Sequence, residues 1–476
     1  MKKNCIKLSV AAIVLTLLLG ACKKFLNVQP EDKVIEAQVF SSKSGINTAL
    51  NGLYINLAKS NLYGENLTLS TVEILAQRYN VPSTHSLYKI ASYAYGDKPA
   101  TTKFDAIWTD AYSTILNINS FLENLEKYTG VLDTKTESLY KGEALAMRAL
   151  LHLDLLRLYG PKYNSADSTK QSIPYYENSQ SKINPLLPAN QIMQKVLSDL
   201  QHAEELLKND IIITAGINPP AANAEVDFVN NSRNYRLNYY AVKGLLARAY
   251  LYRGDKVSAL AAAKSVIQQA DKFKWTTTTN ALSEKVNPDR VFSTEMIFGT
   301  MNTQLYNNYL ALFDPAVTEG NILAPAPARL TAVFESNESD YRYNLNWQIP
   351  STGIKSYRTF YKYADVVDKT KTFRFTIPLL KISEMYYIAA ECEPVAADGI
   401  NQLNVVRLNR GLANLSTTVN VNTELQKEYQ KEFFGEGQLF YYYKRRNVTS
   451  VGNGTGSGNI TIVPVVPLPL SESQYR

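Results

Sequence analysis

The chain of 476 residues is 45% hydrophobic and 20% charged, which are ordinary values for a globular protein and exclude a disordered chain. Its formal net charge of +7 falls by three, to +4, when the lysines of the N-terminal signal predicted below are removed. So small an excess, with no dense basic tract beyond Lys444–Arg446, argues against a nucleic-acid-binding protein.

The N-terminal segment has the organisation of an export signal. Three lysines accompany an apolar run at residues 8–19, which is shorter than the roughly 20 residues that a membrane-spanning helix needs. The run ends in Leu-Gly-Ala-Cys, an order that resembles a bacterial lipobox, in which the cysteine thiol takes a diacylglyceryl group. We therefore predict a signal peptide at 1–21 and a lipid anchor on Cys22, which several acyl chains make stable. An ordinary secretory signal with a chance cysteine is the alternative.

The cysteine count agrees with this interpretation. Cys5 lies in the predicted signal and Cys22 carries the predicted anchor, so only Cys392 remains and no internal disulfide can form in the mature chain. A large domain needs none, because its core suffices. Cys392 stands at an apolar helical position, and we expect it to be a small buried hydrophobic residue.

From about residue 34 to 270, apolar residues recur every three to four positions, which predicts one amphipathic helix after another. The stretch that ends at Gly160-Pro161 is apolar over most of its circumference, so we expect a central buried helix there. On this helix, Glu143 and Arg148 can form an internal pair, and His152 is expected to be a satisfied core histidine. Trp108 lies on the buried stripe of the preceding helix.

The residues "YYAVKGLLARAYLYRGDKVSALAAAKSVIQQA" match the second half of the tetratricopeptide pattern, with small residues at the helix contact and Gly254 at the turn. The predicted fold is therefore mainly α, a short tetratricopeptide-like helical-repeat superhelix with an irregular loop and short-strand region. The predicted organisation is a signal peptide at 1–21, a tether at 22–40, a helical-repeat region at 41–271, an irregular insertion at 272–376, and a C-terminal helical region with its tail at 377–476.

Several blocks, in this order, resemble the SusD/RagB family of surface lipoproteins. They include "CKKFLNVQPED" directly after the lipobox, "GEALAMRALLHLDLLRLYG", "LNYYAVKGLLARAYLYRGD", "EYQKEFFGEGQLFYYYKR" and the closing "VPLPLSESQ", and they cover nearly the whole mature chain. The chain departs from the family at Tyr429 and Gln438, where Arg is usual, and at Tyr441-Tyr442, where Asp-Leu is frequent. We expect these departures to affect helix packing rather than ligand contacts.

The resemblance implies a non-catalytic protein of the cell outer membrane, anchored by lipid and facing outside. Such a protein captures oligosaccharides during polysaccharide utilisation and delivers them to a partner SusC-like TonB-dependent transporter. Two alternatives stay open: a peptide-capturing, RagB-like lid, and a helical-repeat adaptor that binds no small ligand.

The chain contains 32 tyrosines, and some of them fall in loops away from the helical stripes. A sugar ring has an apolar face and a rim of hydroxyls, so a rigid aromatic plate with polar neighbours suits it. Three aromatic segments, at 77–98, 299–313 and 342–353, have this composition, and at least one is expected to contribute. The predicted ligand-binding residues are Arg78, Tyr93, Tyr95, Tyr306, Asn308, Tyr309 and Trp347. The alternative for each is an aromatic residue that closes a loop over the core.

The sequence has none of the common catalytic motifs, such as His-Glu-x-x-His, Gly-x-Ser-x-Gly, a Walker loop or Cys-x-x-Cys. Its three histidines, His85, His152 and His202, are too scattered for a metal site. We therefore predict a binding protein rather than an enzyme, with no cofactor besides the acyl groups on Cys22. Calcium is compatible with the sequence but not indicated by it.

Overall fold

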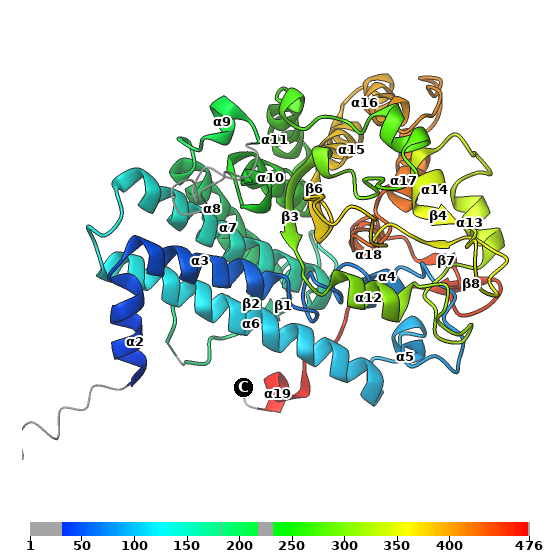
Figure 1. Ribbon diagram of the computed structural model, residues 1–476. Coiled ribbons are helices and arrows are strands. Elements are labelled where there is room, and N and C mark those ends of the chain that lie inside the picture. Colours follow the sequence, from blue (N-terminus) through cyan, green and yellow to red (C-terminus); the bar gives the residue numbers. More distant parts are fainter. Residues whose placement is uncertain (1–30, 181, 218–231, 475–476) are drawn as a thin grey trace, which may run out of the picture.

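The structure is a computed structural model that describes residues 31–180, 182–217 and 232–474 (Figure 1). The predicted signal peptide, Cys22 and the first part of the predicted tether lie outside the described residues. The rest of that tether forms helix α2 (Glu31–Phe40). In the three described ranges, no helix combines the length and the apolar character that crossing a membrane requires.

The N-terminal half is a series of helices, as the periodicity predicts. Their bounds are α3 (Lys43–Leu57), α4 (Thr71–Leu75), α5 (Tyr88–Ala91), α6 (Lys98–Lys127), α7 (Thr134–Tyr159), α8 (Ala189–Leu206), α9 (Ile212–Ala215), α10 (Tyr239–Arg253) and α11 (Lys256–Ile267). The short strands β1 (Gln171–Ile173) and β2 (Leu187–Pro188) pair between α7 and α8. α6 and α8 both pack on α7, α10 packs on α8, and α11 packs on α10.

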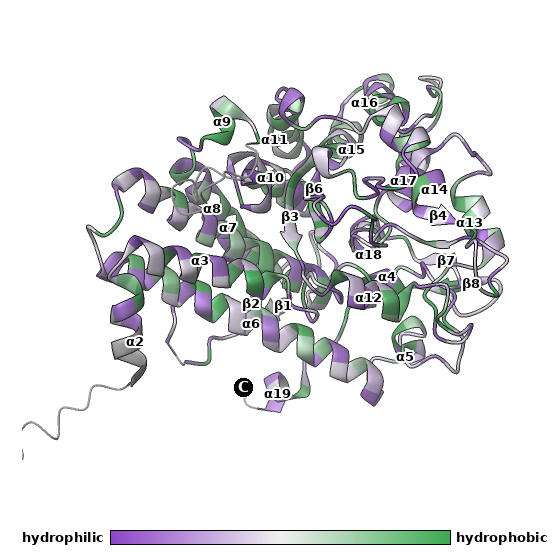
Figure 2. Ribbon diagram, viewed as in Figure 1, coloured by the Kyte–Doolittle hydropathy of each residue, from purple (hydrophilic) through white to green (hydrophobic). Residues whose placement is uncertain are grey.

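The predicted central helix is α7, and almost all of its side chains from Thr136 onward are buried. The carboxylate of Asp133 caps its start by accepting a hydrogen bond from the backbone N–H of Thr136, and the helix ends before Gly160. The neighbouring helix α6 instead alternates hydrophobic and hydrophilic positions along its length (Figure 2), because only one face of it is covered. The predicted burial of Trp108 on α6 is confirmed.

The strands β3 (Met296–Met301) and β6 (Thr376–Lys381) form an antiparallel ribbon across the middle of the molecule (Figure 1). The segment between the two strands leaves one end of this ribbon and returns to it, and we call it the excursion. It carries α12 (Leu305–Leu312), α13 (Pro327–Val333), α14 (Tyr341–Asn346) and the paired strands β4 (Trp347–Gln348) and β5 (Thr359–Phe360). This excursion accounts for most of the predicted irregular insertion.

Helices return after β6. They are α15 (Ile382–Cys392), α16 (Ala396–Leu408), α17 (Val421–Glu432), α18 (Leu439–Arg445) and the terminal α19 (Leu470–Gln474), with the strand pair β7 (Ser450–Gly452) and β8 (Asn459–Thr461) before α19. α15 packs on α11, so the C-terminal helices continue the layer that the N-terminal helices begin. One hydrophobic cluster extends from Phe40 to Val466 and forms the main core, and a smaller separate cluster consists of Ala281, Phe292 and Leu345. The mainly α, tetratricopeptide-like fold class is confirmed.

Two core predictions are confirmed and one is wrong. Cys392 is buried, and His152 is fully buried, with Nδ1 donating to the carbonyl of Arg148 and Nε2 accepting from the N–H of Tyr176. The predicted pair of Glu143 with Arg148 does not form. Arg148 instead binds Asp199 on α8, and Glu143 binds Arg233. Five residues on a helix correspond to a rotation of about 140°, so the two side chains point to different neighbours.

Candidate ligand-binding surface

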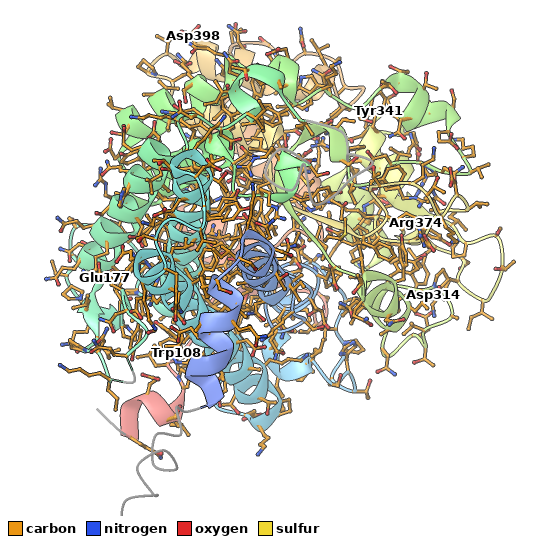
Figure 3. All side chains as sticks on the ribbon, turned by 60° about the vertical axis from the view of Figure 1, so that its left-hand side comes forward. Trp108, Glu177, Asp314, Tyr341, Arg374 and Asp398 are labelled. Carbon is orange, nitrogen blue, oxygen red and sulfur yellow. The ribbon has the colours of Figure 1, made fainter. Side chains whose placement is uncertain are left out.

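The excursion brings together the three aromatic segments that were predicted as binding loops. The ring of Phe313 contacts both Tyr79 and Phe360, with centroids 5.9 and 5.1 Å away, and Phe360 contacts Trp347 at 4.8 Å. The segments therefore meet in one continuous aromatic layer, although they lie far apart in the sequence. In Figure 3, Asp314 and Arg374 lie on the side of the molecule opposite Glu177.

Most of the predicted aromatic residues lie inside this layer rather than on its surface. Trp347 is fully buried, and the side chains of Tyr93, Tyr95 and Tyr309 are also buried. The hydroxyl of Tyr93 donates to the carbonyl of Leu75, and that of Tyr95 donates to the carbonyl of Val463. In this structure these rings are not the exposed plates that the sequence suggested. They close the loops over the core, which is the alternative given above.

Arg78 also has a structural environment. Its guanidinium is buried, forms an ion pair with Glu73 at 3.2 Å, and stacks on the ring of Phe434 at 3.9 Å. It also donates to the carbonyl of Tyr429, at the C-terminal end of the chain. These contacts join the start of the first predicted segment to α4, to α17 and to the loop after α17, and none leaves the guanidinium facing solvent.

The α12 residues are the predicted ones that reach the surface. Tyr306 is partly exposed and its hydroxyl donates to the carbonyl of Arg374 at 2.7 Å. Asn308 is also partly exposed, with its amide donating to the carbonyl of Gly64 at 2.9 Å. Tyr309 lies directly beneath, with its ring 6.4 Å from that of Tyr361. Helix α12 therefore carries the predicted cluster that remains a candidate.

Three further residues, which the sequence analysis missed, lie near the candidate residues of α12. Tyr361 follows β5 and is partly exposed, Asp314 follows α12, and Arg290 precedes β3. No local pattern could have linked them to α12, because folding of the excursion alone brings them together. We call Arg290, Tyr306, Tyr309, Asp314 and Tyr361 the Tyr361 site.

The electrostatics of the Tyr361 site favour hydrogen bonding rather than proton transfer. Burial raises the pKa of Tyr309, and the neighbouring Tyr361 and Asp314 raise it further. Burial also raises the pKa of Tyr361 and of Tyr306. All three phenols therefore stay protonated at neutral pH and act as donors. A partly exposed ring face, hydroxyls, a carboxylate and a guanidinium form a set that can bind a polyhydroxylated ligand.

Loops from separate parts of the chain frame the site. The ring Nε2 of His85 lies 3.0 Å from the carbonyl oxygen of Asn321, and the hydroxyl of Tyr357 donates to the carboxylate of Glu319 at 2.7 Å. The tip of the β4–β5 hairpin next to them exposes Ile349 and Ile354. The loops around the site are thus held together by side-chain contacts and rest on the helical body.

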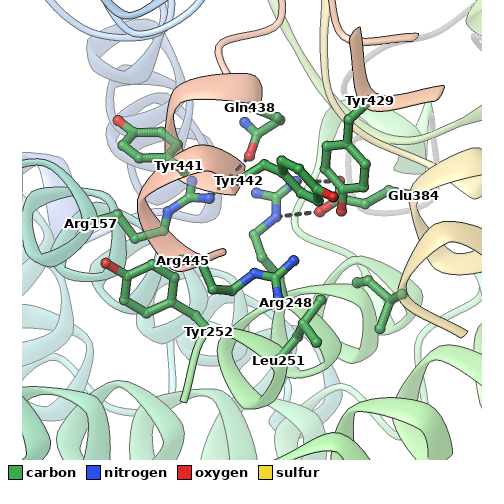
Figure 4. A pocket seen from close by; sticks show the side chains of 11 residues that line it. Arg157, Arg248, Leu251, Tyr252, Glu384, Tyr429, Gln438, Tyr441, Tyr442 and Arg445 are labelled. Carbon is green, nitrogen blue, oxygen red and sulfur yellow. Dashed lines mark hydrogen bonds and ion pairs between the residues drawn. The ribbon is translucent and has the colours of Figure 1, made fainter. Parts of the chain in front are cut away.

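Away from the Tyr361 site, a cavity of about 30 Å³ lies between α10, α15 and α18 (Figure 4). The hydroxyls of Tyr252 and Tyr441 lie at it without a hydrogen-bond partner among the described residues, and the ion pair of Arg248 with Glu384 forms part of its wall. The space suits one or two waters and is too small for a sugar. Tyr429, Gln438 and Tyr441-Tyr442, the positions that depart from the family pattern, all line it. They lie away from the Tyr361 site, at helix contacts.

The fold and the surface define a class of protein: a tetratricopeptide-like helical body with one loop-borne aromatic face. Solved structures share this fold. A SusD superfamily protein from Bacteroides thetaiotaomicron superposes with a TM-score of 0.71 at 20% identity, covering 91% of this chain and 98% of that one. A structure described as a laminarin-binding SusD-like protein superposes with a TM-score of 0.65 at 16% identity, covering 91% and 98%.

The sequence comparisons name the family. Residues 24–251 match the SusD-like family model described as starch-binding and associating with the outer membrane. The SusD-like protein P38 of Formosa agariphila is 22% identical over 500 residues, which cover 90% of this chain and 89% of that protein. The match over residues 24–251 and the similarity to the Formosa agariphila protein bear out the resemblance to the SusD-like family that the sequence blocks indicate.

Proposed function

We propose that this protein is a cell-surface lipoprotein that captures oligosaccharides and delivers them to a SusC-like TonB-dependent transporter in the outer membrane, without altering them chemically. The single observation that carries this proposal is the Tyr361 site. Partly exposed tyrosine rings there adjoin a carboxylate and a guanidinium on loops that a helical body holds in place. The family description, which names starch binding and the outer membrane, supports the same function.

The geometry suits a sugar better than it suits catalysis. The rings of Tyr306 and Tyr361 offer apolar faces to the CH groups of a sugar ring, while Asp314 and the phenol hydroxyls can bond its hydroxyls. The phenols have raised pKa values, so none of them serves as a base at neutral pH. Capture followed by release to a partner requires only this reversible binding.

Calorimetry of the full chain in detergent, against starch, laminarin, galactan and xylan oligosaccharides and a set of peptides, tests the proposal. We expect at least one oligosaccharide to bind and to be recovered intact. Tyr361→Ala should weaken that binding about tenfold, which corresponds to about 1.4 kcal/mol, because a stacking face is lost. Tyr250→Ala is the matched control, since Tyr250 is also a partly exposed tyrosine but lies on α10 in the helical repeats.

Four outcomes would contradict the proposal in different ways. Binding of peptides alone would indicate a peptide-capturing lid. Co-purification with a transporter without any small ligand would indicate an adaptor. Equal losses for Tyr361→Ala and Tyr250→Ala would place the ligand elsewhere on the protein, and release of a shortened glycan would reveal an enzyme.

A further inference from the structure

A small cavity opens beside the Tyr361 site, with a volume of about 10 Å³. Tyr306 and Tyr363 contribute to its wall, and the cations that join them there are Arg290, Lys362 and Arg374. No carboxylate lines it. A cavity of this size admits a water molecule or a single oxygen atom of a ligand, but not a sugar ring.

Two of the three cations are already neutralised by the protein. Arg374 forms an ion pair with Asp365 at 2.8 Å, and Lys362 forms one with Glu436. Arg290 has no such partner among the described residues, although its side chain is only 8% exposed. The cavity therefore contains one buried positive charge for which the described part of the chain supplies no counter-charge.

The hydrogen bonds of Arg290 show which edge of its guanidinium is available. Nη1 donates to the carbonyl of Ala364 at 3.3 Å, while the buried Nε has no hydrogen-bond partner in the described part of the chain. The Nε–Nη2 edge is thus left open, and this edge is the fork that binds carboxylates and sulfates through two parallel hydrogen bonds. The phenol groups of Tyr309, Tyr361 and Tyr306 lie near enough to this guanidinium to interact with it electrostatically.

An arginine stays protonated in proteins, and an unpaired buried charge is unfavourable by several kcal/mol. Burial lowers the pKa of Arg290, which reflects this unfavourable environment, but cannot remove the charge. A bound anion would compensate it. The position beside the partly exposed Tyr306 and Tyr361 indicates that such an anion arrives as part of a ligand held against those rings.

We propose that Arg290 binds an anionic substituent, a carboxylate or a sulfate, on the captured oligosaccharide, so that the ligand is an acidic glycan. This inference rests on the function proposed above. The sugar ring lies against Tyr306 and Tyr361, and one oxygen of the substituent enters the cavity to meet the open edge of Arg290.

Matched glycans that differ only in charge test this directly. Calorimetry at low salt compares oligogalacturonate with its methyl ester, for a carboxylate, and sulfated galactan oligosaccharides with their desulfated forms, for a sulfate. We expect the wild-type chain to bind the charged member of one pair at least tenfold more tightly. Arg290→Gln should reduce this preference to about twofold or less, because affinity for the charged member should fall much more than affinity for the neutral member.

Arg329→Gln is the matched control. Arg329 is partly buried, and among the described residues its Nη1 has no hydrogen-bond partner and its guanidinium forms no ion pair, but it lies on α13 outside the cavity. The control should keep the full preference for charge. Equal binding of charged and neutral glycans by the wild-type chain would overturn the inference and leave the capture function standing. Equal losses in both variants would also overturn it.

A second measurement decides the question even when no glycan of the panel binds, a result that would count against the capture function alone. Sodium sulfate should raise the thermal midpoint of the wild-type chain and of Arg329→Gln by about 1–2 °C more than that of Arg290→Gln, relative to sodium chloride of equal ionic strength. Circular dichroism verifies that Arg290→Gln is folded, and Arg290→Lys replaces it otherwise. Identical shifts in all three proteins would show that water fills the cavity, and would overturn the inference.

Discussion

At the scale of single residues, Glu73 shows how the backbone can satisfy a buried carboxylate. Its oxygens accept hydrogen bonds from the N–H groups of Gly435 and Gly437, at 3.1 and 2.9 Å, and form the ion pair with Arg78. Burial raises the pKa of Glu73, and these contacts oppose that rise. Both glycines have positive φ angles, so the sequence "GEG" is required by the conformation that presents the two N–H groups.

Gly437→Ala should destabilise the protein strongly. A Cβ at this position would lie 1.9 Å from the carbonyl oxygen of Leu67, in a backbone conformation that already disfavours a side chain. We expect a loss of about 4 kcal/mol in the free energy of unfolding, measured by urea titration. Gly130→Ala is the control: its φ is equally positive but its Cβ would meet nothing within 4 Å, so only about 1–2 kcal/mol should be lost. Equal losses of unfolding free energy in the two variants would show that the positive φ alone, and not the contact with Leu67, causes the destabilisation.

The same scale marks the limit of what the sequence can say about the site. The sequence found the three aromatic segments, because tyrosine with polar neighbours is a local pattern. It could not tell which rings face out, since the burial of Trp347 depends on Phe360 and Phe434, which come from β5 and the loop after α17. It could not identify Arg290 either, because the residues that folding brings near a guanidinium decide whether it has a partner.

At the scale of elements, α17 is tied to its neighbours by buried charge. The carboxylate of Glu432 accepts hydrogen bonds from Arg410 at 2.8 and 3.0 Å, from Lys381 on β6 at 2.9 Å, and from Arg342 on α14 at 3.1 Å. Burial alone would raise the pKa of Glu432, but these three cations outweigh it, so the pKa lies well below its usual value. One side chain thus joins the C-terminal helices to the excursion that carries the site.

Glu432→Gln should cost about 3–5 kcal/mol of unfolding free energy, because it leaves buried cations without their counter-charge. Glu424→Gln on the same helix is the control, since Glu424 pairs with the more exposed Lys427, and it should cost less than about 1 kcal/mol. Because the pKa of Glu432 is lowered by folding, its contribution to the free energy of unfolding is present above about pH 4.5 and is lost as the pH falls below that value. Urea titrations at pH 7 and pH 4 should show a smaller pH effect in Glu432→Gln.

Helices were the elements that the sequence predicted best, because the apolar periodicity of α6 and α8 and the N-caps of α7 and α10 are local features of the sequence. The β3–β6 ribbon was foreseen only as short strands in an irregular region. Its pairing joins residues such as Gly299 and Pro378 across the whole excursion, and its register shifts twice along β3. No local signal fixes a pairing over such a separation, which the packing of α10 beneath the ribbon helps to decide.

At the scale of the whole molecule, the first described helix and the candidate site lie at opposite ends. α2 lies at one end of the helical body, while α12, α13 and the β4–β5 hairpin lie at the other (Figure 1). An anchor that precedes α2 would therefore hold the body at the membrane and leave the loop-borne face unobstructed. The helical body separates the two functions, attachment and ligand capture, that the proposal assigns to the chain.

The proposed anchor predicts the behaviour of three cysteine variants. Cys22→Ser should be recovered in the soluble fraction without attached acyl chains, whereas the wild-type chain should stay with the outer membrane and carry them, as mass spectrometry of its N-terminal peptide would show. Cys5→Ser changes only the predicted signal, and Cys392→Ser changes a buried thiol whose pKa burial raises to about 12, so both should remain membrane-bound. Retention of Cys22→Ser in the membrane would show that another contact, such as the partner transporter, holds the protein there.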